Sequence, residues 1–251
     1  MSKLSLIGLT KASHARQCVF IINYLYMCDI ESKQMDNLIF KIRPEGLENP
    51  ETGLIRREEI LVFDTETTGL NRNVDNILQF SAIDGNGQTL MNQLFHPDRV
   101  AAWPQAQSVN HISPEDVADA PLIAEWADRI LDLFRRAHLI VAYNIRFDYN
   151  MLLGNLPGQR GELCHIIKHS ANHHVYDVMW RFPAVYAHEN PGANPSTKPQ
   201  KLGACAAYYG FQGGRLHDAL EDARATLHCF YKVAEAEEKY GFIDVPSPFH
   251  R

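Results

Sequence analysis

The segment Ile60-Leu61-Val62-Phe63-Asp64-Thr65-Glu66-Thr67-Thr68-Gly69-Leu70 carries the strongest structural signal in the chain. It opens with four apolar residues in a row, which is typical of a buried strand. Two acids, Asp64 and Glu66, follow with one residue between them, and side chains two apart on a strand lie on the same face. The segment therefore predicts a buried strand that ends in two carboxylates pointing the same way.

Further strands and helices alternate along the chain after this segment. The turn Asp84-Gly85-Asn86-Gly87 lies between two apolar runs and indicates a β-hairpin. The expected strands are 60–63, 77–83, 89–95, 138–143 and 175–178, and the expected helices are 122–136, a helix from about residue 147, 201–209 and 218–239. This order predicts an α/β domain of three layers, with a mixed central sheet flanked by helices.

Composition and charge narrow the possible classes of protein. Of the 251 residues, 45% are apolar and 22% are charged, which is ordinary for a soluble globular protein. The net charge of -6 lies wholly in residues 60–251, because basic and acidic side chains balance in residues 1–59. Such a charge excludes a basic protein that coats DNA through its phosphates. Five cysteines without a C-x-x-C pair argue against a disulfide scaffold or a zinc ribbon, and they predict a reducing, cytoplasmic compartment.

Residues 1–57 form an N-terminal extension of unknown role. Its apolar run, Cys18–Cys28, is shorter than the roughly 20 residues that span a membrane, so no membrane association is expected. Basic residues precede the run as in a signal peptide, but no small-residue cleavage site follows, and we interpret it as a helix or strand packed on the main body. Prolines and glycines in residues 41–59 predict a linker, the main domain is expected over 58–240, and a tail over 241–251.

The paired acids of the first segment have two interpretations when they are taken alone. Two carboxylates held side by side at a buried strand end repel each other and need a cation. Oxygen ligands favour Mg²⁺ or Mn²⁺ over zinc. Acids at an exposed strand end would instead be solvated, with no ligand role. The D-x-E pattern by itself leaves both interpretations open.

A second acid follows another apolar strand, in Ala142-Tyr143-Asn144-Ile145-Arg146-Phe147-Asp148. Neighbouring strands of a mixed sheet could bring Asp148 beside Asp64. Alternatively, Asp148 only stabilises the N-terminus of a helix, an effect of about 0.3–1 kcal/mol.

The third acidic segment is Leu216-His217-Asp218-Ala219-Leu220-Glu221-Asp222. Asp218 and Glu221 have the spacing of a capping pair, which predicts a helix that begins after Asp218. His217 then lies in the preceding loop and Asp222 lies one turn into the helix. An imidazole near a helical carboxylate suits a general base beside a metal ligand, although a surface histidine beside a surface acid would have the same pattern.

Taken together, these segments resemble one family. Asp64-x-Glu66, Asp148 and His217-x-x-x-x-Asp222 are similar to the three motifs of the DEDDh 3′→5′ exonucleases, the family of the proofreading epsilon subunit of bacterial DNA polymerase III, of RNase T and of oligoribonuclease. The resemblance extends from about Ile60 to Tyr231 and includes 109–116 and Leu202-Gly203. Tyr143 departs from the family pattern because it stands where a histidine is usual. The first 55 residues match no part of the family.

The resemblance implies a ribonuclease H-like fold and a two-metal mechanism. Asp64, Glu66, Asp148 and Asp222 would hold two Mg²⁺ or Mn²⁺ ions, and His217 would take a proton from the attacking water. The products would be nucleoside 5′-monophosphates released from a 3′ end. Two divalent ions would change the charge of the domain from -6 to about -2, so metal-free protein should bind nucleic acid poorly.

The same resemblance suggests how a strand would be positioned. Leu70 would wedge against the terminal base, or else it is a core residue beside a turn. Thr67 would meet the 3′ end through its backbone, and Asn144 would contact the sugar-phosphate. Six basic side chains could contact phosphates, although each could equally be an ordinary solvated cation. They are Arg146, Arg160, Lys168, Lys198, Lys201 and Arg215.

Two features lie outside these motifs. His165, His169, His173 and His174 gather near Cys164 and Asp177, which fits either a zinc site or a polar, histidine-rich loop. Trp103 could stack on a base, or it could pack a loop onto the body.

The sequence therefore favours a metal-dependent 3′→5′ exonuclease that acts on single-stranded nucleic acid, with DNA favoured as substrate and polymerase proofreading or DNA repair as its role. Other hypotheses are an exonuclease of RNA or short oligonucleotides, a nuclease-like module that binds a DNA polymerase subunit, and a zinc hydrolase built on the histidine cluster. No residue plainly recognises a 2′-hydroxyl, so the choice between DNA and RNA stays open.

Overall fold

The computed structural model describes residues 55–169, 174–192, 199–214 and 216–241. Its centre is a five-stranded mixed sheet with the order β3-β2-β1-β4-β5. The strands are β1 (Ile60–Thr67), β2 (Ile77–Asp84), β3 (Thr89–Leu94), β4 (Leu139–Ala142) and β5 (His174–Asp177). β1 pairs antiparallel with β2 and parallel with β4. The predicted mixed sheet is confirmed, and β1 lies at its middle.

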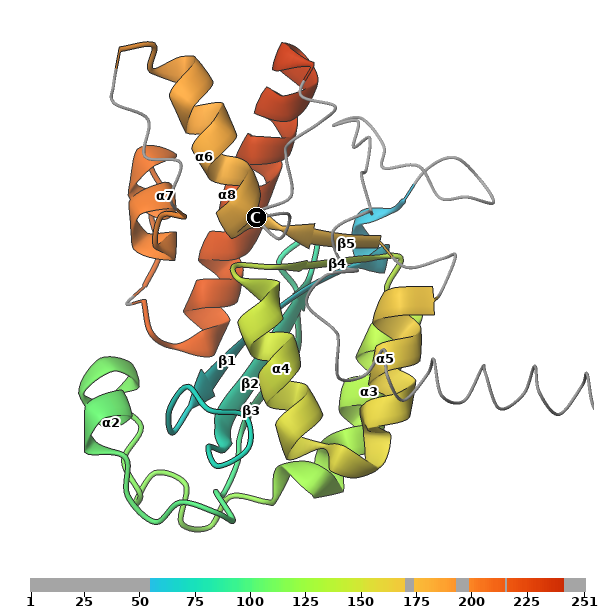
Figure 1. Ribbon diagram of the computed structural model, residues 1–251, viewed down its shortest axis with the longest axis vertical. Helices are drawn as coiled ribbons and strands as arrows, with labels where there is room; N and C mark the ends of the chain where they lie inside the picture. Colours follow the sequence, from blue (N-terminus) through green and yellow to red (C-terminus); the bar gives the residue numbers. More distant parts are fainter. Residues whose placement is uncertain (1–54, 170–173, 193–198, 215, 242–251) are drawn as a thin grey trace, which may run out of the picture.

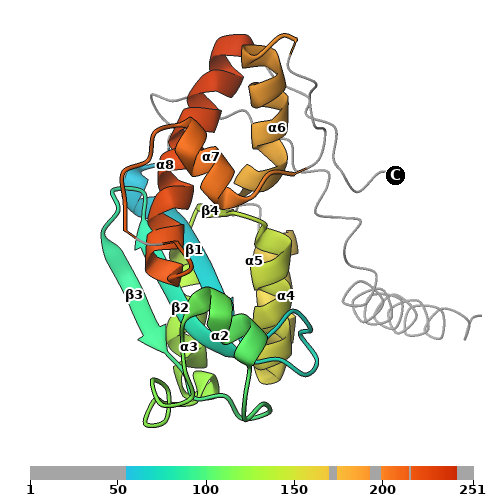
Figure 2. The ribbon, with the colours of Figure 1, turned by 90° about the vertical axis from the view of Figure 1, so that its left-hand side faces the viewer.

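Helices cover both faces of the sheet, as Figures 1 and 2 show. α3 (Ala127–Arg136), α4 (Ile145–Asn155) and α5 (Arg160–His169) pack on one face, and α6 (Val178–Glu189), α7 (Leu202–Tyr208) and α8 (Ala219–Tyr240) pack on the other. The short α2 (Pro104–Asn110) lies beside the carboxyl end of β1. The described residues also form three short 3-10 helices, η2 (Arg57–Glu59), η3 (Ile123–Trp126) and η4 (Pro157–Gln159). The predicted three-layer α/β fold is confirmed.

The alternation of side chains along β1 builds both halves of the core. Leu61 and Phe63 face α3, α4 and α5, whereas Ile60 and Val62 face α6, α7 and α8. The strand continues through the acidic segment to Thr67, farther than the apolar run predicted. The same alternation therefore directs Asp64 and Glu66 to the side of α8.

The predicted hairpin between β2 and β3 is present. The Asp84 carboxylate accepts hydrogen bonds from the backbone N–H groups of Asn86 and Gln88, both at 2.8 Å. Gly87 has φ +82°, a conformation that favours glycine. The Gly85 N–H donates to the Arg57 carbonyl at 2.8 Å, so the residues just before β1 dock onto this turn.

The helices at 104–110, 160–169 and 178–189 were not predicted, and the expectation of a polar loop at the histidine cluster was wrong up to His169. Leu163, Cys164 and Ile166 are buried in one core cluster, and this apolar face holds α5 on the sheet. Trp103 is buried and its Nε1 donates to the Ile112 carbonyl at 2.7 Å, so it packs a loop rather than stacking on a base.

Several sequence predictions lie outside the described residues. They concern the apolar run 18–28, most of the linker and the C-terminal tail. In the described part of the chain, no helix combines the length and apolar character of a membrane span. Cys164, Cys205 and Cys229 are buried and form no disulfide within the described part of the chain.

Candidate active site

Four acids come together from three elements at the carboxyl end of β1. Asp64 and Glu66 lie on β1, Asp148 lies in the first turn of α4, and Asp222 lies in the first turn of α8. β1 and β4 are parallel neighbours, so the connection from β4 into α4 starts at the edge where the β1 acids lie. The helix α8 reaches the same edge from the opposite face of the sheet.

The side chains at this edge lie close to one another. One donor atom from each of Glu66, His217 and Asp222 falls within 4.8 Å of the other two. The carboxylate of Asp64 is repelled by the charges of Asp148, Asp222 and Glu66, in decreasing order of strength. The four predicted carboxylates therefore share one pocket, with His217 at its exposed side.

Burial and mutual repulsion shift the pKa values of these acids strongly. Burial, with the charges of Asp222 and Asp148, raises the pKa of Glu66 to about 8, against an opposing hydrogen bond from Asn110. Burial raises the pKa of Asp148 to about 7 and that of Asp222 to about 6. Burial and the neighbouring carboxylates also hold the pKa of Asp64 well above its usual range. A pocket of this kind favours a bound cation, because a cation removes the repulsion.

Thr65 holds the Asp148 carboxylate. Its N–H and its Oγ1 donate to Asp148 Oδ1 at 3.1 Å and 2.7 Å. Tyr143, in the place of the usual histidine, points elsewhere: its hydroxyl donates to the Gln200 carbonyl at 2.8 Å. Thr65 was not identified from the sequence. It alternates with Asp64 and Glu66 along β1, so its side chain points to the opposite face of the sheet, where α4 lies.

Asp177 fixes the start of α4. Its carboxylate accepts from the N–H groups of Asn144 and Ile145 at 3.0 Å and 3.1 Å, and from the N–H of Met179 at 3.1 Å. Asn144 has φ +70°, a left-handed conformation that needs such support. Asp177, which the sequence placed only beside the histidine cluster, therefore ties β5 and α6 to the turn that leads into the Asp148 helix.

The segment before α8 presents His217. Asp218 caps the helix, accepting from the N–H groups of Leu220 and Glu221. His217 is exposed at φ +71°, and its N–H donates to Asp222 Oδ1 at 3.2 Å. Gln79 of β2 accepts from the Ala219 N–H at 3.1 Å, so a sheet residue anchors this helix start. The predicted helix start is confirmed, but Glu221 accepts from the Gly214 N–H rather than completing a capping box.

The predicted substrate contacts differ in their exposure to solvent. Leu70 is 85% exposed, so the alternative of a core residue is wrong. Thr67 is buried, and its carbonyl accepts from Asn110 Nδ2 at 3.1 Å. Asn144 is half-buried beside the Asp148 helix. Arg146 and Lys201 are exposed and Arg160 is half-buried, whereas the side chains of Lys168, Lys198 and Arg215 lie outside the described residues.

The described donors of the second predicted metal cluster do not converge. Cys164 is buried, and its Sγ accepts from the Tyr149 hydroxyl at 3.3 Å. Asp177 binds backbone N–H groups, as described above, and His165 is exposed on α5. The side chains of His169, His173 and His174 lie outside the described residues. Among the described residues, the group of donors close enough to hold a metal ion is Glu66, His217 and Asp222.

The fold is ribonuclease H-like, and a cluster of carboxylates at the end of its central strand is the kind of site found in two-metal nucleases. The exonuclease family model, RNase_T, matches residues 61–230. The chain therefore belongs to this exonuclease family, and its domain is an enzyme domain of the 3′→5′ exonuclease class.

Relatives of known identity agree with this assignment. The chain is 34% identical over 199 residues to DNA polymerase III subunit epsilon of Escherichia coli, covering 72% of this chain and 74% of that protein. It is 29% identical over 171 residues to the epsilon subunit of Treponema pallidum, covering 67% and 73%.

Solved structures support the fold. Escherichia coli exonuclease I in complex with a dT13 oligonucleotide superimposes with a TM-score of 0.57 at 21% identity, over 73% of this chain and 42% of that one. Exonuclease I of Methylocaldum szegediense superimposes with a TM-score of 0.53 at 26% identity, over 72% and 40%. The chain thus spans about two-fifths of the exonuclease I chains.

The raised pKa values predict how stability depends on pH. The folded, metal-free protein holds protons on Glu66, Asp148 and Asp222 more tightly than the unfolded chain does, so its free energy of unfolding should fall as the pH rises from about 5 to 8. We expect a loss of more than about 1.4 kcal/mol, the value of one pKa unit.

Urea unfolding in EDTA, followed by tryptophan fluorescence at several pH values, measures this loss. Saturating Mg²⁺ should remove or reverse the slope, because the ion favours the ionised acids. A Glu66→Gln, Asp148→Asn protein is the control and should show a flatter curve. Stability that rises across this range without metal would contradict the shifts.

Proposed function

We propose that the chain is a metal-dependent 3′→5′ exonuclease that shortens single-stranded DNA and releases nucleoside 5′-monophosphates. The observation that carries this proposal is the meeting of four carboxylates from β1, α4 and α8 in one pocket, with an exposed histidine beside Asp222. These acids lie up to 158 positions apart in the chain, from Asp64 to Asp222, and only the fold brings them together.

Two Mg²⁺ or Mn²⁺ ions would be held by Asp64, Glu66, Asp148 and Asp222. The donor set fits these ions, because it consists of carboxylate oxygens whose mutual repulsion is otherwise uncompensated. The ions, when bound, would activate the attacking water and stabilise the leaving 3′ oxygen.

His217 would act as the general base in this reaction. Its ring lies within reach of the pocket, and its backbone is tied to the Asp222 carboxylate. Because the side chain is exposed, it can pass the proton on to solvent.

Three residues would place the 3′ end of the substrate. Leu70 offers an exposed apolar surface four residues after Glu66, on which the terminal base would rest. Asn144 would meet the sugar-phosphate, and the backbone of Thr67 would face the terminal sugar. DNA is favoured because the relatives include a DNA polymerase III subunit and because exonuclease I structures hold deoxyoligonucleotides.

The cellular setting is proposed on the same relatives. A role in proofreading or repair, association with a DNA polymerase subunit, and a cytoplasmic location follow from the likeness to epsilon. Residues 1–57 would be an extension, 58–240 the catalytic domain and 241–251 a tail.

A digestion assay with a strand labelled at its 5′ end tests the proposal. With Mg²⁺ or Mn²⁺, we expect a ladder that shortens by single nucleotides, and EDTA should abolish it. A DNA strand should be digested at least about tenfold faster than the RNA strand of the same sequence, which corresponds to about 1.4 kcal/mol of discrimination. Cuts within the strand, or a ladder that persists in EDTA, would contradict the mechanism. Faster digestion of RNA would overturn the choice of substrate.

A further inference from the structure

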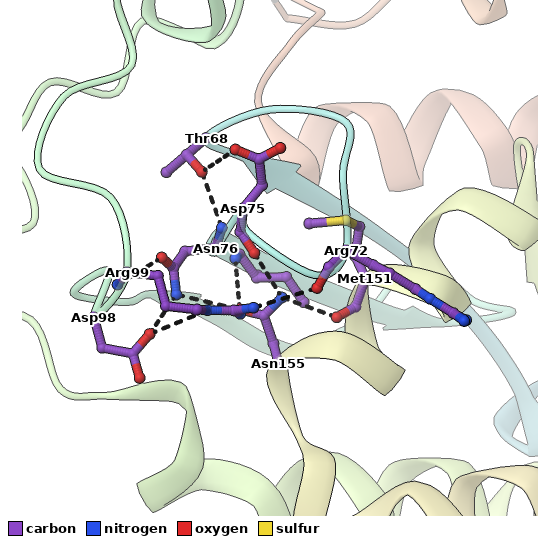
Figure 3. A network of polar contacts seen from close by, with 9 residues as sticks. Thr68, Arg72, Asp75, Asn76, Asp98, Arg99, Met151 and Asn155 are labelled. Atoms are coloured by element: carbon purple, nitrogen blue, oxygen red, sulfur yellow. Dashed lines mark hydrogen bonds and ion pairs between the residues drawn. The ribbon is translucent and has the colours of Figure 1, made fainter.

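The loop between β1 and β2, residues 68–76, combines exposed apolar side chains with a tightly bonded backbone. Leu70 is 85% exposed and Val74 is 53% exposed. Figure 3 shows the polar contacts that surround the loop. A loop held this tightly gives its exposed side chains a fixed place on the surface, so they can present a preorganised apolar contact to a ligand.

Asp75 closes the loop from the inside. Its Oδ1 accepts from Thr68 Oγ1 at 3.1 Å, and its Oδ2 accepts from the Asn71 N–H at 2.8 Å. Thr68 also pairs with Asn76, through a backbone bond of 2.9 Å and a bond from the Asn76 N–H to Thr68 Oγ1 at 2.9 Å. A Cβ atom on Gly69 would lie 2.6 Å from the Asp75 carboxylate, so a larger residue at 69 would push this carboxylate out of its place.

Asn155 fixes the closed loop from outside. This buried residue ends α4, and its Oδ1 accepts from the Ile77 N–H at 3.1 Å. Its Nδ2 donates to the Asp75 carbonyl at 3.3 Å and to the Met151 carbonyl at 2.9 Å. Next to it, a Cβ atom on Gly154 would lie 2.1 Å from the Arg72 carbonyl oxygen. The end of α4 therefore touches the loop on both sides of Asp75.

The same helix carries a pocket acid at its other end. Asp148 lies in the first turn of α4 and Asn155 is its last residue. A single rigid element thus connects the metal pocket with the loop that presents Leu70.

We propose that Asn155 is a positioning residue that sets the place of Leu70 relative to the acid pocket. This inference rests on the proposed exonuclease function. In that function, the terminal base rests on Leu70. The distance between this base and the acid pocket then decides whether the scissile phosphate reaches the acids. A displacement of about 1 Å at such a contact costs up to about a hundredfold in rate.

A double-mutant cycle tests the proposal on a labelled single-stranded DNA. Asn155→Ala and Leu70→Ala should each lower kcat/KM about tenfold. Adding Asn155→Ala to the Leu70→Ala protein should then cost less than twofold, because the residue that Asn155 places is already gone. The rise in Tm caused by Mg²⁺ should be unchanged in all three proteins.

Asn190→Ala provides a matched control. Asn190 follows α6 and donates to the Tyr186 carbonyl, four residues earlier, at 2.9 Å, as Asn155 does to Met151. Its other hydrogen bond goes to the Tyr208 hydroxyl, at 3.1 Å, and not to the loop, so its removal should leave kcat/KM within twofold of the original. Should Asn155→Ala fail to fold, Asp75→Ala replaces it, since Asp75 is a half-buried loop residue with the same expected coupling to Leu70.

The outcomes are distinct. Equal losses from Asn155→Ala in both backgrounds would show a purely structural role and overturn the inference, while leaving the proposed function intact. Unchanged activity in Asn155→Ala would also overturn it. If the original protein does not shorten DNA at all, the proposed function fails and the inference fails with it.

Discussion

Replacing Asp64 with alanine is expected to slow digestion of a DNA 3′ end by about a thousandfold or more, equivalent to about 4 kcal/mol of activation free energy. Asp64 is the acid that feels the other three pocket carboxylates, so it lies at the centre of the charge that the ions would neutralise. Asp222→Ala should have an effect of the same size, because Asp222 joins the pocket from the opposite face of the sheet.

The stability of the same variants separates a lost ligand from a lost fold. Without metal, Asp64→Ala should unfold at the same or a higher temperature than the original protein, since a half-buried carboxyl that its neighbours repel is removed. The increase in Tm on adding Mg²⁺ should shrink. Asp132→Ala, which removes a half-exposed acid that pairs with Arg136 on α3, is the control and should change neither property. An Asp64→Ala protein that digests DNA at the original rate would show that the site is wrongly assigned.

Removing the imidazole of His217 should lower kcat by about 10²–10⁴-fold, the range of a lost general base. Metal binding should persist, because the four carboxylates are untouched. Titration calorimetry with Mn²⁺ measures the binding, and single-turnover digestion measures the chemical step.

The backbone at His217 calls for a second variant. The residue sits at φ +71°, where asparagine is tolerated better than alanine. His217→Asn should therefore keep the loop and its bond to Asp222 while losing the base, and it should be as slow as His217→Ala. His188→Ala, at an exposed position on α6, is the control. A fast His217→Asn protein would exclude a base at this position and indicate that the loop conformation alone matters.

The sequence predicted those parts of the fold that a local pattern encodes. The apolar run 60–63 and the hairpin turn at 84–87 specify their own conformations, and both are present. The helix α5 was missed because its histidines obscure a short apolar face whose partner is the sheet. Burial against distant residues, rather than local propensity, decides such segments.

The site was predicted because its three motifs occur in the order that the family shows. None of its acids could be identified as a ligand from its own segment alone. Asp148 could have been a simple helix-end acid, and only the parallel pairing of β4 with β1 brings it to the pocket. Its partner Thr65 is 83 positions away in the chain, and Asp177 supports Asn144 across 33 positions. Contacts of this range follow from the folded arrangement, so the sequence pattern did not indicate them.

The most direct test of the central claim is an anomalous difference map from crystals grown with Mn²⁺. The account predicts two peaks among the carboxylates of Asp64, Glu66, Asp148 and Asp222, and their loss in the Asp64→Ala, Asp222→Ala protein. A map with no peak at these acids, or with manganese only at the histidines of α5, would contradict it.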